Sequence, residues 1–176
     1  MSERRICLLR GVNVGGVKVE MAPLRELAAG LGLQNPQTLL ASGNLVVDSP
    51  LAPPALEARL EAAIAERFGR SIDVIVRTGE QWRVMMTANP FQEQAATDGA
   101  KLLVMVMKTG VRPGAVEALR AFAADGERVE EAGGDLFFWH PHGLGRSKMA
   151  EKAQPRLIGP GTGRNWNTAL KLLALL

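Results

Sequence analysis

The stretch LLRGVNVGGVKV, residues 8–19, places a basic side chain, an amide and two adjacent glycines directly after a strand-like apolar run. A glycine-rich loop between a strand and a helix can direct backbone N–H groups at an anion, while a nearby cation supplies charge. We therefore expect ligand contacts from Arg10, Asn13, Gly15, Gly16 and Lys18. The same pattern is also typical of a tight turn that needs glycine for its φ angles, and it matches neither dinucleotide-binding nor P-loop fingerprints.

A second polar stretch, Ser42, Gly43 and Asn44, separates two short apolar runs in TLLASGNLVVDS, residues 38–49, and predicts a hairpin. In a βαββ unit the first two strands run parallel, so the loop after the first and the turn after the second lie at the same end of the sheet. The sequence therefore predicts that loop 11–18 and turn 42–44 form one polar rim.

The third candidate is GTGRNWNTALKLLALL, residues 161–176, which predicts a helix over 165–174 capped by Thr162 or Asn165. Its apolar stripe is predicted to contain Trp166, Ala169, Leu170 and Leu173. Its polar side chains recur at helical spacing, which predicts a shared arc formed by Arg164, Asn167, Thr168 and Lys171. Such an arc is either the solvated side of a helix or, given its asparagines, a ligand-reading surface that includes Asn165.

No catalytic residue can be assigned. Ser42 lacks the G-x-S-x-G pattern of a nucleophile elbow, and Ser147 directly precedes Lys148 instead of forming an S-x-x-K dyad. His140 and His142 have no third histidine or cysteine nearby, so we expect no metal site and no cofactor. The GRSK segment is interpreted as a basic loop in which Lys148 contacts phosphate.

Composition is that of an ordinary globular protein, with 176 residues of which 47% are hydrophobic and 22% charged. The single cysteine, Cys7, excludes an internal disulfide and is expected to be inert in a buried strand. Neither a signal peptide nor a membrane helix is indicated, so we expect a cytoplasmic protein without membrane contact. The net charge of +3 is uneven, because residues 140–176 hold six basic residues and one acid.

The elements that must position these residues follow from periodicity. The first half predicts a strand at 4–10, a helix at 21–31, a hairpin at 38–49, a helix from Pro53 to Gly69 and a strand at 72–77. This βαββαβ order predicts an α+β fold with a ferredoxin-like antiparallel sheet. The fold therefore places the first two polar stretches on one sheet.

The second half partly repeats this order, with a helix at 79–88, a strand at 101–108, a helix at 114–124, a hairpin at 127–140 and a short helix at 146–152. We therefore expect two ferredoxin-like subdomains and a C-terminal helix. The polar segment NPFQEQAATDGA predicts a linker at 91–100 between an N-terminal subdomain, 1–90, and a C-terminal one, 101–176.

Nucleic acid is disfavoured as a partner, although ferredoxin-like sheets invite comparison with RNA-recognition modules. Those modules stack bases on aromatic residues, and the predicted strands of the first sheet contain none. In the second hairpin Phe137, Phe138 and Trp139 are consecutive, so they point to both faces and are typical of core.

These motifs resemble a bacterial family, domain of unknown function 1697 (DUF1697). The resemblance runs along nearly the whole chain through LLRGVNVGG, M..LR.L...LGL, T.L.SGN.V.DS, VRT, NPF, SK and T.RNWNT..KL. It implies two ferredoxin-like α+β subdomains and marks the first loop, the SGN turn and RNWNT as signature positions. It implies no catalytic residue, because no activity is established for the family. Leu39 and Ala41 stand where members commonly have tyrosine and glutamine.

Three functional interpretations remain. The first is a small-ligand-binding module whose polar rim holds an anionic ligand such as a nucleotide or phosphate ester. The second is a metal-independent enzyme that uses the same rim. The third is a structural or oligomerising protein, including a homodimer, in which the motifs hold the fold together.

Overall fold

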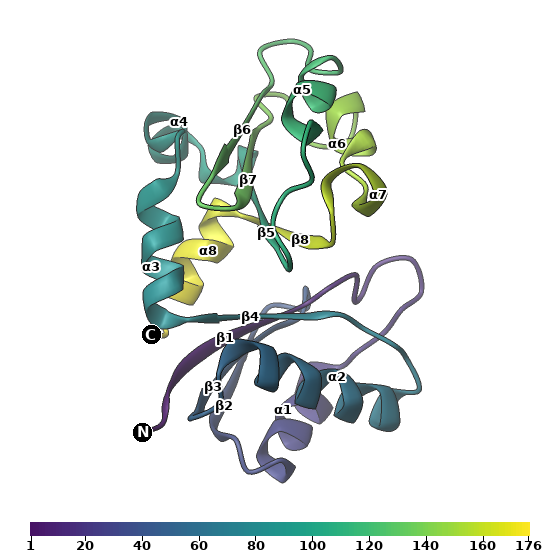
Figure 1. Ribbon diagram of the computed structural model, residues 1–176, viewed down its shortest axis with the longest axis vertical. Helices are drawn as coiled ribbons and strands as arrows, with labels where there is room; N and C mark the ends of the chain where they lie inside the picture. Colours follow the sequence, from purple (N-terminus) through teal and green to yellow (C-terminus); the bar gives the residue numbers. More distant parts are fainter. The chain divides into compact units, whose positions relative to one another are not determined.

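The computed structural model describes all 176 residues, which form two compact units (Figure 1). Unit 1 comprises Met1–Arg83 and Leu172–Leu176, and unit 2 comprises Val84–Lys171. The division falls within two helices, α3 (Gly79–Ala88) and α8 (Trp166–Leu173). No helix is both long and apolar enough to cross a membrane.

Unit 1 contains a four-stranded antiparallel sheet with the strand order β2-β3-β1-β4. The strands are β1 (Glu3–Leu9), β2 (Gln34–Leu39), β3 (Asn44–Ser49) and β4 (Val74–Thr78). Both β1 and β2 pair antiparallel with β3, so they run parallel to each other. The helices α1 (Met21–Gly30) and α2 (Pro53–Phe68) lie on one face of the sheet (Figure 1). This topology confirms the ferredoxin-like prediction.

The core of unit 1 lies between this sheet face and the two helices. It contains alternate strand residues and the apolar stripes of both helices: Cys7, Leu9, Leu45, Val47, Val74, Val76, Leu24, Ala28, Leu56, Leu60 and Ile64. Prolines are tolerated in the first helical turn, and α2 begins at Pro53 and ends at Phe68, followed by the cap residue Gly69, whose φ is 65°. Burial raises the pKa of the Cys7 thiol, so this cysteine is inert core, as expected.

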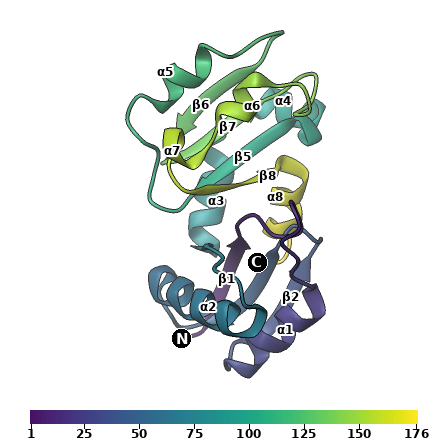
Figure 2. The same ribbon diagram turned by 90° about the vertical axis from the view of Figure 1, so that its right-hand side faces the viewer.

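Unit 2 repeats the topology in its own sheet, with the strand order β6-β7-β5-β8. The strands are β5 (Leu102–Met107), β6 (Arg128–Ala132), β7 (Asp135–Trp139) and β8 (Gly161–Asn165). Three short helices lie over one face of this sheet (Figure 2): α5 (Ala115–Arg120), α6 (Lys148–Lys152) and α7 (Pro155–Ile158). Phe137 and Phe138 are fully buried, which confirms that they are core. The second ferredoxin-like subdomain is thereby confirmed.

Three parts of unit 2 differ from the sequence prediction, and the first is the short helix α7, which was not predicted. The segment 91–100, predicted to be a linker, contains α4 (Gln92–Thr97) and the start of the 3-10 helix η1 (Gly99–Lys101), which Asp98 caps through the Ala100 N–H. Strand β8 was not predicted, because GTGRN has two glycines and an asparagine and only one residue of the β-branched or aromatic types that mark strands, Thr162. It forms nevertheless, because its backbone pairs with β5 along its length.

Candidate functional site

The first loop and the SGN turn do lie at the same end of the first sheet. Asn13, at φ 58°, joins them through its side chain: the amide nitrogen donates to the carbonyls of Val19 and Ala41, and the amide oxygen accepts from the Val19 N–H. The Leu9 N–H also donates to the Gly43 carbonyl at 2.8 Å. The predicted proximity of the loop and the turn is therefore confirmed.

The residues of the turn are held by their own contacts. Asn44 is fully buried, and its amide nitrogen donates to the Leu39 carbonyl and the Ser42 hydroxyl, both at 2.8 Å. Gly43 has a φ of 83°, and a Cβ there would lie 2.5 Å from the Val12 side chain. These asparagine and glycine positions stabilise the chain reversal, which is a structural role.

The basic residues of this rim already have acidic neighbours. Arg10 pairs with Asp73 at 3.4 Å and Lys18 with Glu20 at 3.3 Å. Gly15 and Gly16 have φ values of 57° and 85° and face open space. The rim is thus assembled as predicted, but its side chains mostly contact the protein itself.

The RNWNT motif is divided between a strand and a helix, which corrects the predicted polar arc. Arg164 lies in β8, not on the helix, and is 6% exposed, with its guanidinium bonded to the Thr162 hydroxyl and the Gly163 carbonyl. Thr168 is also buried, whereas Asn167 and Lys171 are exposed. Burial lowers the pKa of Arg164 to about 10, so it stays charged at neutral pH.

Asn165 and Trp166 have the roles of scaffold residues. The Asn165 side chain accepts from the Thr168 N–H at 2.9 Å, which confirms one of the two predicted caps. Trp166 is 6% exposed, and the buried positions that follow it are Ala169 and Leu172. Leu170, assigned to the stripe, is instead 45% exposed, because the buried side of α8 follows the spacing of Trp166, Ala169 and Leu172.

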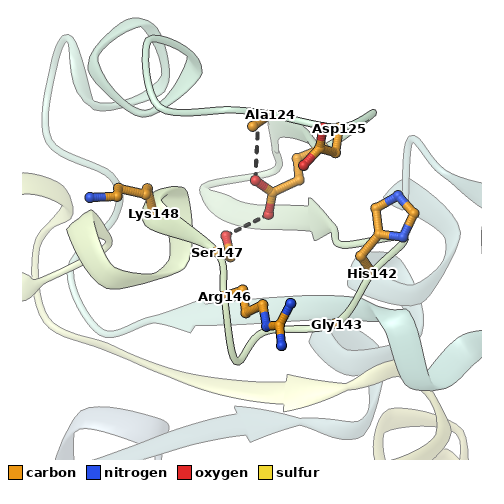
Figure 3. Close-up of a pocket in the computed structure, with 8 residues that line it drawn as sticks. Ala124, Asp125, His142, Gly143, Arg146, Ser147 and Lys148 are labelled. Carbon is orange, nitrogen blue, oxygen red and sulfur yellow. Dashed lines mark hydrogen bonds between the residues drawn. The ribbon is translucent and has the colours of Figure 1, made fainter.

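A pocket of about 720 Å³ lies in unit 2 beside the loop that connects β7 to α6 (Figure 3). Its lining residues are polar, charged or small: Ala124, Asp125, Glu127, His142, Gly143, Arg146, Ser147 and Lys148. Its volume is in the range of small-molecule sites. Of the predicted site residues, the structure places only Lys148 here.

Glu127 holds both ends of this loop with one carboxylate oxygen. Oε2 lies 2.6 Å from His140 Nδ1. The same oxygen accepts a hydrogen bond from the Ser147 hydroxyl at 2.5 Å, while Oε1 accepts from the Ala124 N–H at 3.2 Å (Figure 3). Ser147 Oγ also accepts from the Ala150 N–H and so caps α6. The loop 140–147 is therefore closed by a partly buried acid.

The protonation of this cluster follows from its partners. Burial raises the pKa of Glu127, but hydrogen bonds from Ser147, His140 and the Ala124 N–H outweigh it, so the pKa is lowered overall. An ionised carboxylate only accepts, so His140 Nδ1 carries a proton. His140 Nε2 is buried without a partner in the protein.

The free charges of the pocket come from residues around this cluster. Arg146, Lys148 and His142 have no hydrogen-bond or ion-pair partner, nor does Asp125. The sequence indicates that the GRSK loop is basic, but it does not mark Asp125, Glu127 or His142 as site residues. The close spacing of His142, Arg146 and Lys148 in HPHGLGRSK could have indicated this site. Glu127 is distant in sequence, and only the fold brings it to this loop.

Comparison with protein families identifies the chain. Residues 2–137 match the model of a family described as "Protein of unknown function (DUF1697)". The chain belongs to the DUF1697 family. The resemblance in its motifs is thereby confirmed. The β7–α6 loop and RNWNT lie beyond the residues matched by the DUF1697 model.

A solved structure confirms the fold of this DUF1697 chain. It is that of conserved bacterial protein SP0830 from Streptococcus pneumoniae, with a TM-score of 0.80 and 22% sequence identity over 99% of each chain. At this identity the similarity shows the fold. No match was found among curated proteins.

Proposed function

We propose that this protein binds a small anionic ligand, a nucleotide or a phosphate ester, in the pocket beside loop 140–147 of unit 2. One observation carries the proposal: three basic side chains without acidic partners, Arg146, His142 and Lys148, surround a single pocket. An arginine without a partner carboxylate retains the planar fork that binds phosphate in two places.

The two acids of the pocket lining differ in what they leave available to a ligand. Of the two acids in the lining, Glu127 is 9% exposed, and its oxygens already accept three hydrogen bonds. Both of its oxygens are therefore occupied by protein groups, although the ionised carboxylate keeps its negative charge. Asp125 is the one acid that remains available, against two permanent cations and a histidine.

The basic residues at the rim of the first loop have acidic partners, whereas those in the pocket have none, so the pocket is the proposed site. Arg10 and Lys18 each pair with an acid, and the Asn13 and Asn44 amides are used to hold the turn. This use of the rim supports the structural interpretation of those motifs. It leaves fewer groups there for a ligand.

The test is thermal unfolding in the presence of pyrophosphate, nucleotides and sugar phosphates. A ligand at about 100 times its dissociation constant adds roughly 2.7 kcal/mol to the free energy of unfolding. We expect this stabilisation in the parent protein and in Arg156→Ala, an exposed arginine of α7 in the same unit, and its loss in Arg146→Ala. Stabilisation that survives Arg146→Ala but is lost in Arg10→Ala would place the site at the rim instead.

A further inference from the structure

The pocket in Figure 3 has two poles of opposite charge, and this arrangement restricts the ligand more narrowly than an anion. Resting on the proposed function above, we propose that the ligand is a phosphorylated polyol. Its phosphate contacts Arg146 and His142, and its hydroxyl groups donate to Asp125.

The cationic pole is formed by the β7–α6 loop. Figure 3 shows the Arg146 guanidinium and the His142 ring on the same side of Ser147, with Gly143 between them. Both side chains are exposed, and neither has a partner in the protein. Two nitrogen donors beside a glycine, which leaves room for a group to approach, suit a phosphate.

The acidic pole lies on a turn that the protein holds in shape. The Glu127 N–H donates to the Ala124 carbonyl at 3.0 Å, and the Ala124 N–H donates back to Glu127 Oε1 at 3.2 Å. Asp125 stands between these two residues at φ 53°, with its carboxylate unpaired. An ionised carboxylate only accepts hydrogen bonds, so its partner on a ligand is a donor such as a hydroxyl group.

The two poles do not satisfy each other. No ion pair joins Asp125 to Arg146 or Lys148, although all three line the same pocket. The space between them therefore suits a molecule that has an anion at one end and hydrogen-bond donors at the other. A bare phosphate would leave Asp125 as a repulsive neighbour.

The remaining lining excludes a large apolar or aromatic group. Ala124 and Gly143 are its only residues without a polar side chain, and it contains no phenylalanine or tryptophan. Acyl chains are held in proteins by apolar walls, and bases by apolar walls and by stacking, for which the lining offers only His142 and Arg146, the two side chains assigned to the phosphate. Of the two ligand classes proposed above, the phosphate ester of a polyol is therefore favoured over a nucleotide.

The experiment compares sorbitol 6-phosphate with n-hexyl phosphate by titration calorimetry, because the two differ mainly in the hydroxyl groups on a six-carbon chain. We expect the parent protein to bind sorbitol 6-phosphate at least about tenfold more tightly, which corresponds to about 1.4 kcal/mol. Asp125→Gly removes the acceptor and still tolerates positive φ, so it should abolish this preference while hexyl phosphate binds as well or better. Glu131→Gln, at an exposed acid of β6, is the matched control and should keep the preference.

The outcomes separate the two proposals. If both phosphates bind equally and Arg146→Ala weakens both, the anion site stands and the polyol inference is wrong. If adenosine monophosphate binds more tightly than sorbitol 6-phosphate in both the parent and Asp125→Gly, the inference is also wrong. If no phosphate binds in a way that depends on Arg146, the proposed function itself fails.

Discussion

Gly43 is a residue of the SGN turn that packs closely against Leu9 and Val12, at the end of β1 and the start of the first loop. A Cβ at this position would lie 2.5 Å from Val12 Cγ2 and 2.9 Å from Leu9 Cβ, and the backbone φ of 83° is unfavourable for other residues. Substitution therefore combines backbone strain with a clash in a packed region. The SGN signature is explained by these two requirements.

We predict that Gly43→Ala lowers the free energy of unfolding by about 2 to 5 kcal/mol, the sum of overpacking and left-handed strain. Gly15→Ala is the matched control, because Gly15 has a φ of 57° but no atom within 4 Å of the added Cβ. It should cost only about 1 to 2 kcal/mol. Urea unfolding of both variants measures the difference, and equal losses would contradict the steric explanation.

Trp166 is the second residue with a clear structural role. It is 6% exposed at the start of α8, so we predict that Trp166→Ala costs about 3 to 5 kcal/mol. Leu170→Ala on the same helix is the control, since Leu170 is 45% exposed and should change stability by less than about 0.5 kcal/mol. A large loss of unfolding free energy from Leu170→Ala would contradict the assignment of this leucine to the exposed side of the helix.

At the scale of elements, the pocket depends on a loop that has little regular structure of its own. Residues 140–147 connect β7 to α6, and both ends of the loop bond to Glu127, which lies at the entry to β6. The Glu127 carboxylate therefore holds the pocket loop against the start of β6. Glu127 is a positioning residue in this arrangement.

We predict that Glu127→Ala destabilises the protein by about 1 to 3 kcal/mol, because the buried His140 N–H loses its acceptor. It should also weaken phosphate binding, although Arg146 and His142 are unchanged. Glu131→Ala changes an exposed acid within β6 and serves as the control, which should alter neither stability nor phosphate binding. Phosphate binding that is unaffected by Glu127→Ala would show that the loop keeps its shape without this acid.

The lowered pKa of Glu127 also predicts the pH dependence of this stabilisation. A carboxyl whose folded pKa is depressed stabilises the folded state above its unfolded value, and the contribution is lost as the pH falls through the folded pKa. We therefore expect the stability difference between the parent and Glu127→Gln to be constant above pH 4.5, the ordinary value for this group, and to shrink below it. Chemical unfolding of both proteins across an acidic pH series measures this; a difference that grows on acidification would contradict the assignment.

At the scale of the whole molecule, the charge distribution raises the question of nucleic acid. The basic residues of 140–176 include Arg164, which is buried, and the aromatic residues Phe137 and Phe138 of the second sheet are fully buried. The third aromatic residue of β7, Trp139, is half-buried, so neither ferredoxin-like sheet presents the set of exposed aromatic side chains that such sheets use for RNA.

We predict that the protein binds short RNA or DNA only weakly at physiological salt, because backbone contacts alone give dissociation constants of roughly 10⁻⁴ to 10⁻⁶ M. Fluorescence anisotropy with labelled oligonucleotides over a salt series measures this. The Arg146→Ala protein should behave like the parent, since one contact changes a non-specific interaction little. Binding well below micromolar concentration, with a preference for one sequence, would contradict this prediction.

The sequence by itself determined the repeated βαββ order, and with it the two ferredoxin-like sheets and the meeting of the first loop with the SGN turn. These follow from apolar periodicity, glycine positions and the fixed geometry of a βαββ unit, all of which are local or topological. Only the tertiary structure decided which of the polar residues are free. Arg164 appeared to be a surface cation and is buried in a strand whose glycine-rich sequence gives no strand signal, because pairing with β5 forms it. Glu127 joins the pocket to His140 and Ser147 across 13 and 20 residues of chain, a proximity that depends on how β6, β7 and α6 pack and not on any pattern along the sequence.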